Sequence, residues 1–138
     1  MIIDFHTSIG KAADLYCDPE ELLKEMDANG VGQAIVCPAD RYLAVYNSEG
    51  NDYIAQNITR HPDRFIGFGC ASPWYGKKAV EEVKRIRDLG LKGIKVHPFV
   101  QGFMLSDHFM DPVLEACMAE GLAVLVHTGT PISAMHSR

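Results

Sequence analysis

The sequence predicts an α/β fold in which parallel strands alternate with helices. Apolar runs of strand length recur along the chain, and one stretch with helical periodicity separates each run from the next. Single helices between consecutive strands imply parallel pairing through right-handed crossovers. Two runs, AIVC and AVLV, are apolar at every position, as expected of strands covered on both faces. The predicted order is β-α-β-α-β-α-β-α-β, within a single domain over residues 1–138.

The first two strands and the helix between them have clear boundaries. Residues 1–5 form the first apolar run, and residues 32–38 form the second. Between them, Asp18 is a suitable N-cap and Pro19 suits the first helical position. Gly30 is a suitable residue to end this helix. Residues 1–38 are therefore predicted to form a strand, a capped helix and a buried strand.

The remaining elements continue the same alternation. A helix is expected over residues 51–60, and the His61-Pro62 pair ends it because a residue before proline avoids helical geometry. The other expected elements are strands over 64–70, 91–98 and 122–129 and helices over 77–90 and 111–121, the last with an Asp-Pro start. The last nine residues fit no element.

This order is compatible with two architectures. A doubly wound five-stranded sheet matches the length of 138 residues, whereas a (β/α)8 barrel normally needs about 250 residues and would be represented by its first part. A flavodoxin-like or response-regulator-like module fits the length alone. The chain lacks a glycine-rich phosphate loop after the first strand and an aspartate at the end of the third, both of which such modules would need.

The composition excludes several classes of function. A net charge of −5 without a basic stripe argues against nucleic acids and anionic membranes as partners. No apolar run approaches the about 18 residues of a membrane span, and the start lacks the pattern of a signal peptide. The four cysteines, Cys17, Cys37, Cys70 and Cys117, form no C-x-x-C pair. We expect free thiols, buried except for Cys17, in a reducing cytoplasm.

Polar side chains at the ends of the predicted strands are the candidates for chemistry, because parallel α/β folds form their sites there. Alternation along an extended strand would place Asp4, His6 and Ser8 on one face. Lys95 and His97 end the fourth strand by the same alternation. His127 and Thr128 follow the fifth strand.

Three histidines thus lie at strand ends, and imidazoles that converge from different strands are suitable ligands for a catalytic zinc or a similar ion. Each histidine alone could be a hydrogen-bonded core residue, so the joint pattern carries the prediction. His61, His108 and His136 are expected on the surface without partners.

Several segments in the same order resemble the amidohydrolase superfamily. They are IIDFHTSIG, HPDRFIGFGCASP, LKGIKVHP, the Asp-Pro helix start and GLAVLVHTG. The nearest branch includes aminocarboxymuconate-semialdehyde decarboxylase-like and resorcylate decarboxylase-like enzymes, and the resemblance extends from the first residue to about Thr130. It implies a (β/α)8 barrel with one or two divalent metals, often zinc. The family ligands are an H-x-H on the first strand, a histidine on the fifth, usually another on the sixth, and an aspartate on the eighth.

This resemblance assigns expected roles to residues of the chain. His6 matches the first histidine of H-x-H, Ser8 stands in place of the second, and His127 matches the ligand on the fifth strand. Lys95 and His97 lie where relatives place a substrate contact or, in some branches, a carboxylated lysine or a glutamate that bridges two metals. We expect no bridge here and expect both residues to recognise an anionic substrate. The expected supporting residues around the metal are Asp4, Ser8 and Thr128.

The chain also departs from the family pattern. A serine hydroxyl is a poor zinc ligand beside imidazole, and the sequence contains neither the sixth-strand histidine nor the eighth-strand aspartate. Two imidazoles remain where a catalytic zinc takes three protein ligands. The expected function is metal-dependent hydrolysis of an amide or ester, or decarboxylation of a small carboxylic acid, impaired or incomplete in this chain. The alternative is a non-catalytic barrel remnant that binds a small molecule or a partner.

A barrel that stops after its fifth strand would leave the first and fifth strands with unpaired backbone groups. Apolar side chains at these edges would need cover. We expect either a flattened open sheet or a homo-oligomer that covers the edges.

Overall fold

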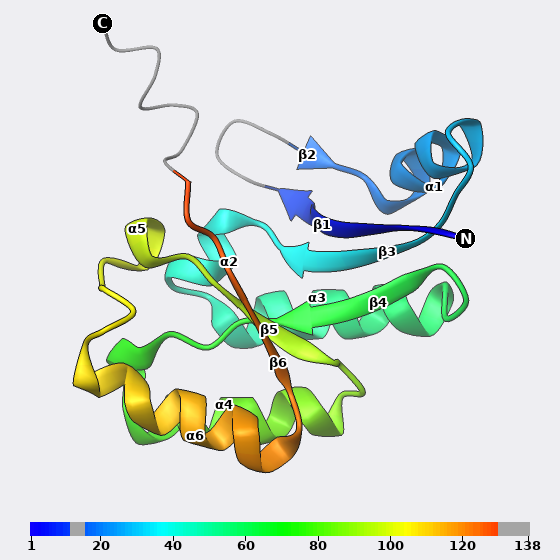
Figure 1. The fold of residues 1–138 in the computed structure, drawn as a ribbon. Coiled ribbons are helices and arrows are strands. Elements are labelled where there is room, and N and C mark those ends of the chain that lie inside the picture. Colours follow the sequence, from blue (N-terminus) through cyan, green and yellow to red (C-terminus); the bar gives the residue numbers. More distant parts are fainter. Residues whose placement is uncertain (12–15, 130–138) are drawn as a thin grey trace, which may run out of the picture.

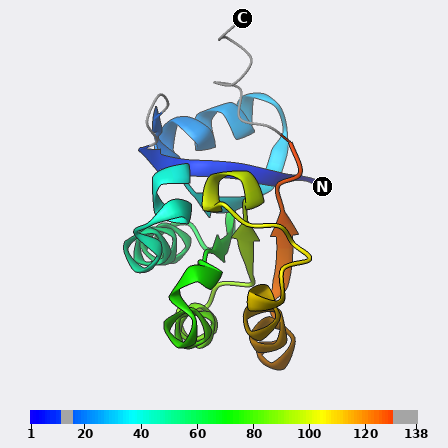
Figure 2. The same ribbon diagram turned by 90° about the vertical axis from the view of Figure 1, so that its left-hand side faces the viewer.

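A computed structural model of the chain describes residues 1–11 and 16–129, which form a curved sheet with helices on one side (Figures 1 and 2). The strands are β1 (Ile2–Lys11), β2 (Tyr16–Cys17), β3 (Val31–Pro38), β4 (Phe65–Gly69), β5 (Gly93–Val96) and β6 (Ala123–Val126). The helices are α1 (Pro19–Ala28), α2 (Asp40–Ala44), α3 (Asn47–Arg60), α4 (Lys77–Asp88), α5 (Pro98–Gln101) and α6 (Asp111–Glu120). Two 3-10 turns cover Pro73–Tyr75 and His108–Met110.

The strand order decides between the two predicted architectures. The six-stranded sheet has the order β2-β1-β3-β4-β5-β6, and all pairs are parallel except β1 with β2. The parallel strands therefore follow their order in the chain, whereas a doubly wound sheet reverses direction at a switch point. In Figure 2 helices α1, α3, α4 and α6 follow one another around the outside of the curved sheet. The prediction of an incomplete TIM-type barrel is confirmed.

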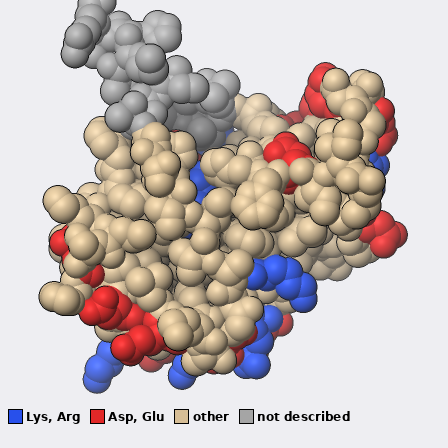
Figure 3. All heavy atoms as spheres, in the orientation of Figure 1, with Lys and Arg blue, Asp and Glu red and all other residues tan. Residues whose placement is uncertain are grey.

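Each of the two outer parallel strands, β1 and β6, has one edge that is unpaired or nearly so within the described residues. β6 pairs only with β5, and β2 pairs with β1 only at Gly10 and Lys11. Large apolar side chains along these strands are exposed, namely Ile2, Ile3, Phe5 and Val124. Uncharged residues make up most of the surface that faces the viewer in Figure 3. The expected exposed barrel edges are present in the structure.

Alternation along β3 divides the buried side chains between two faces. Ala34 and Val36 belong to the main core, which α1, α3, α4 and α6 cover. Ile35 and Cys37 point the opposite way and pack with Phe68 of β4 on the inner face of the curved sheet. Each face of β3 is therefore apolar, as the continuous apolar run predicted.

Most predicted boundaries agree with the structure. Asp18 caps α1, and its Oδ1 accepts the backbone N–H groups of Glu20 and Glu21. Helix α3 begins at Asn47, four residues earlier than expected. Asp111 lies inside the first turn of α6 and does not cap it, because a 3-10 turn leads directly into this helix. Short elements β2, α2 and α5 lacked a periodic signal.

All four cysteines are free thiols, and three of them, Cys37, Cys70 and Cys117, are buried. Burial raises the pKa of Cys37 to about 12, so this thiol is protonated near neutral pH. Over the residues that the structure describes, every helix is too short or too polar to cross a bilayer.

Candidate active site at the carboxyl ends of the strands

A β-bulge in β1 changes which side chains face the candidate site. Asp4 pairs with Ala34 and Thr7 with Val36, so three residues of β1 span two residues of β3. Ser8 pairs with Cys37 and therefore faces the inner side of the sheet, while Asp4 lies with Ala34 on the opposite side. The expectation that Asp4 shares a face with Ser8 is wrong, because alternation breaks at the bulge.

Asp4 stabilises this bulge from within. Its Oδ1 accepts the His6 backbone N–H at 3.1 Å, and its Oδ2 accepts the Thr7 hydroxyl at 2.5 Å. These two bonds fix the backbone at the irregular position and so set the direction of His6. Asp4 is therefore a positioning residue for β1.

Parallel register brings the polar residues of β5 and β6 together. Lys95 pairs with Leu125 and Val96 with Val126, so the next two residues, His97 and His127, are neighbours on adjacent strands. Their rings stack with centroids 3.9 Å apart and planes 19° from parallel. The His127 backbone N–H donates to the Val96 carbonyl at 2.9 Å and extends the ladder beyond β6. Two predicted site residues are thus in direct contact.

His6 approaches the same pair from the other side of the curved sheet. Its ring centroid lies 6.1 Å from that of His127. β1 and β6 are separated by three strands in the sheet, so this approach depends on the curvature visible in Figure 2. All three strand-end histidines therefore converge.

Lys95 and Ser8 form a direct link across the inner face. Lys95 Nζ donates to Ser8 Oγ at 3.0 Å, although 87 residues separate them in the chain. Lys95 is buried, whereas Ser8 is partly exposed. The Ser8 hydroxyl, at the position where the resemblance places a second histidine, therefore accepts a hydrogen bond from an ammonium group.

The buried side-chain amide of Gln101 helps to hold His97 in place. Gln101 Oε1 accepts the His97 backbone N–H at 2.7 Å, and Gln101 Nε2 donates to the Leu43 carbonyl at 3.2 Å. His97 Nδ1 accepts the Val100 backbone N–H at 3.4 Å, which assigns the ring proton to Nε2. Gln101 was not predicted from sequence, since a lone glutamine after a strand has no distinctive pattern.

The surroundings of His6 and His97 lower the pKa of both imidazoles. Burial, Lys95 and His127 together lower the pKa of His6. Burial and His127 lower the pKa of His97, and Lys95 adds to this effect. The carboxylate of Asp40, at the start of α2, opposes both shifts. Asp40 is a missed site residue, which its position two residues after β3 could have indicated.

The lowered pKa values predict that the protein loses stability in mild acid. Unfolded histidine has a pKa of about 6.5, so below that value the unfolded chain binds protons that folded His6 and His97 resist. The free energy of unfolding should therefore fall between pH 7.5 and pH 5. Urea unfolding at both values checks this, and His97→Gln should reduce the loss while His108→Gln, at an exposed position, should not. An unchanged loss in His97→Gln would contradict the assignment.

The donor set gives part of a metal site. Two imidazoles that share an ion through bonds of about 2.1 Å hold their ring centres roughly 5–6 Å apart, and His6 and His127 lie near that spacing. The Nε2 atom of His127 is buried without a hydrogen-bond partner. Within residues 1–11 and 16–129, however, no three or more His, Cys, Asp or Glu side chains are placed to hold a metal ion. A complete catalytic zinc site, with three protein ligands, does not fit these residues.

Thr128, His61 and His108 make none of the contacts described above. Thr128 is exposed at the end of the described chain. His61 and His108 are not unpartnered, because His61 Nε2 lies 3.1 Å from Glu20 and His108 Nδ1 lies 3.1 Å from Asp111. His136 lies outside the described residues.

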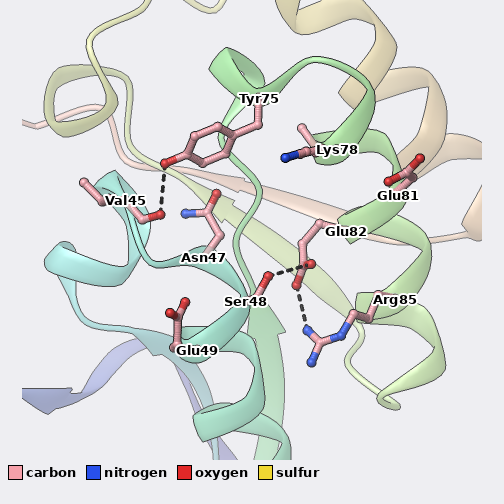
Figure 4. Close-up of a pocket in the computed structure, with 10 residues that line it drawn as sticks. Val45, Asn47, Ser48, Glu49, Tyr75, Lys78, Glu81, Glu82 and Arg85 are labelled. Carbon is pink, nitrogen blue, oxygen red and sulfur yellow. Dashed lines mark hydrogen bonds and ion pairs between the residues drawn. The ribbon is translucent and has the colours of Figure 1, made fainter.

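A separate cleft of about 500 Å³ lies between α3 and α4 and shares no residue with the histidine cluster (Figure 4). Glu82 is its central group and accepts hydrogen bonds from Ser48, Asn51 and Arg85. Arg85 also pairs with Asp52. The polar groups of this cleft hydrogen-bond to one another and link α3 to α4. We therefore interpret the cleft as a contact that stabilises the fold.

Curved parallel strands in sequential order, with helices around their outside, define part of a (β/α) barrel, and histidines and a lysine gather at the carboxyl ends of its strands. The model of the amidohydrolase family Amidohydro_2 matches residues 3–138, and the chain belongs to this family. The resemblance drawn from the sequence motifs is confirmed.

Known relatives include decarboxylases. The chain is 38% identical over 78 residues to 2-amino-3-carboxymuconate-6-semialdehyde decarboxylase of Dictyostelium discoideum, a match that covers 56% of this chain and 22% of that protein. The structure is similar to 5-carboxyvanillate decarboxylase of Sphingomonas paucimobilis, with a TM-score of 0.79 and 22% identity over 99% of this chain and 55% of that one.

The corresponding enzyme of Novosphingobium aromaticivorans, complexed with manganese and 4-hydroxy-3-methoxy-5-nitrobenzoic acid, gives a TM-score of 0.82 and 21% identity over 98% of this chain and 52% of that one. At these identities the structural likeness shows the fold. The chain spans about half the length of these solved structures.

Proposed function

We propose that this chain provides the N-terminal half of an amidohydrolase-family active site that acts on a small carboxylic acid, by decarboxylation or by hydrolysis of an amide or ester bond. The observation that supports this most strongly is the convergence of His6, His97 and His127 at the carboxyl ends of the strands. The family match and the decarboxylase relatives favour a carboxylic acid. The described residues alone form an incomplete site, so full activity needs ligands from elsewhere.

In this proposal His6 and His127 bind a divalent metal. Zinc is the ion that the family pattern favours, and manganese is the ion in the solved Novosphingobium enzyme. A bound ion would activate water or polarise the acid. Lys95 and His97 bind the anionic substrate, and Asp4, Ser8 and Thr128 support the residues around the metal. The free thiols are consistent with a reducing cytoplasm.

Metal binding provides the first test. Elemental analysis of protein purified without a chelator or a histidine tag should find about one divalent ion per chain or per pair of chains. Titration with Zn²⁺ or Mn²⁺ should then show that His6→Ala and His127→Ala each weaken binding by more than the roughly 10–100-fold that loss of an outer-shell partner costs. His108→Ala, which changes an exposed histidine, serves as the control. Absence of metal, with none taken up on titration, would contradict the proposal.

Turnover separates the enzyme from the second candidate, a non-catalytic binding module. The incomplete donor set favours that candidate for the chain alone. Metal-dependent loss of CO₂ from an aromatic carboxylate, abolished in His127→Ala, would establish the enzyme. Substrate binding without turnover, both in the isolated chain and in any assembly that supplies the missing ligands, would establish the binding module.

We further propose that a second copy of the chain covers the free edges at β1 and β6. Phe5 is 64% exposed on β1, and an exposed apolar strand edge favours pairing with another chain. Light scattering should show a dimer or larger species, and Phe5→Lys should shift it toward the monomer. Met118→Lys, on the exposed face of α6, should leave the mass unchanged. A monodisperse wild-type monomer would exclude this association.

A further inference from the structure

Lys95 carries a charge for which the described residues supply no counter-charge. The residue is only 2% exposed, and no described Asp or Glu carboxylate lies within 4.0 Å of its Nζ. Its hydrogen bond goes to the neutral hydroxyl of Ser8. Burial of an ammonium group is costly unless an anion compensates it. Asp40 acts on the nearby imidazoles, but no described carboxylate pairs directly with the Lys95 ammonium group.

A second buried group on the same face also lacks a partner. His127 Nε2 is inaccessible to solvent and makes no hydrogen bond. The register of β5 against β6 places Lys95 and His127 on one face, because Lys95 pairs with Leu125 two residues before His127. The Lys95 ammonium group is a charged donor for one carboxylate oxygen. When no metal is bound, His127 can donate to the second oxygen in the tautomer that carries its proton on Nε2.

We propose that Lys95, held by Ser8, binds the carboxylate of the substrate without the help of a metal, and that Ser8 determines this choice of ligand. The proposal deepens the proposed function, on which it rests for the carboxylic acid. A hydroxyl at position 8 accepts the Lys95 N–H and leaves the ammonium in the site. An imidazole at that position would complete the H-x-H pair with His6, place a metal-binding nitrogen beside Lys95, and favour a divalent ion over the anion.

Binding of benzoate in the presence of EDTA tests the first part. Benzamide has nearly the same shape without the charge, so it is the matched ligand. We expect wild-type protein to bind benzoate at least about tenfold more tightly than benzamide, as expected of a hydrogen bond to a charged group. Lys95→Gln should abolish this preference, whereas Lys92→Gln, at an exposed position on the same segment, should retain it.

Three results would overturn the proposal: equal affinity of the wild type for benzoate and benzamide, an unchanged preference in Lys95→Gln, or benzoate binding that requires added Mn²⁺. The last result would place the carboxylate on the metal. The comparison of the two ligands on wild-type protein keeps the test decisive if Lys95→Gln fails to fold.

Variants at position 8 test the second part. Ser8→His should raise Mn²⁺ and Zn²⁺ affinity at least about tenfold and weaken benzoate binding in EDTA by a similar factor. Ser8→Ala removes the hydroxyl without adding a ligand, so it should leave metal affinity unchanged and weaken benzoate binding severalfold. Unchanged affinities in Ser8→His would contradict the role of Ser8.

The two proposals fail in different ways. If wild-type protein takes up no metal but prefers benzoate in EDTA, the metal half of the proposed function is wrong and the Lys95 site stands. If metal binds at His6 and His127 but benzoate and benzamide bind equally, the Lys95 site is wrong and the metal half stands.

Discussion

Replacement of Asn51 by alanine is expected to lower the free energy of unfolding by about 3 kcal/mol. Asn51 is fully buried in α3, and its side-chain amide hydrogen-bonds to the backbone of the residue that follows β4. Its Oδ1 accepts the Cys70 backbone N–H at 2.7 Å, and its Nδ2 donates to the Cys70 carbonyl at 2.9 Å. The same Nδ2 donates to Glu82 at 2.8 Å. Alanine would leave these backbone groups buried and unsatisfied.

Denaturant unfolding of wild type and Asn51→Ala measures this loss. Gln56→Ala lies on the same helix at an exposed position, so it controls for the change in helix composition and should cost less than about 0.5 kcal/mol. Equal losses in the two variants would mean that the Cys70 backbone finds other partners when the amide is removed. A selective loss would show that α3 fixes the loop that follows β4.

The order of strands and helices could be predicted from sequence because burial of one or both faces imposes a regular pattern of apolar residues on each element. Apolar runs marked β3 and β6, and the Asp18-Pro19 start with Gly30 marked α1 at both ends. Those patterns are local, so they could not distinguish a doubly wound sheet from a half-barrel. The family motifs made that distinction, and the sequential strand order confirms it.

The bulge in β1 is the clearest failure of pattern reasoning. Asp4, His6 and Ser8 alternate in sequence, yet the extra residue moves Asp4 to the other face. The bulge is defined by the pairing of Asp4 with Ala34 and of Thr7 with Val36, a pairing between strands that alternation along one strand does not encode. The convergence of His6 with His127 likewise depends on sheet curvature.

The sequence patterns also did not indicate the buried polar side chains around the site. Asn51 and Gln101 are buried amides that hold strand-end backbone, although asparagine and glutamine are mostly exposed in proteins. Hydropathy patterns assign such residues to the surface. Only the three-dimensional structure shows that their partners are strand-end carbonyls and N–H groups.

Replacement of Lys95 by methionine is expected to raise the free energy of unfolding by about 2 kcal/mol while it removes the preference for benzoate. Methionine keeps most of the side-chain volume without the charge, and substitution of a buried charge by a well-packed apolar residue often stabilises a protein by about 1–4 kcal/mol. Lys95 is the only buried lysine or arginine among the described residues, so the effect should be specific to this position.

Urea unfolding of wild type, Lys95→Met and Lys92→Met measures this effect. The Lys92 variant changes an exposed lysine three residues away and should leave stability within about 0.5 kcal/mol of wild type. A destabilised Lys95→Met would mean that the ammonium is already compensated in the folded chain, and it would remove the physical reason for an anion site. A more stable protein that no longer distinguishes benzoate from benzamide would show that the buried charge of Lys95 lowers stability and serves ligand binding.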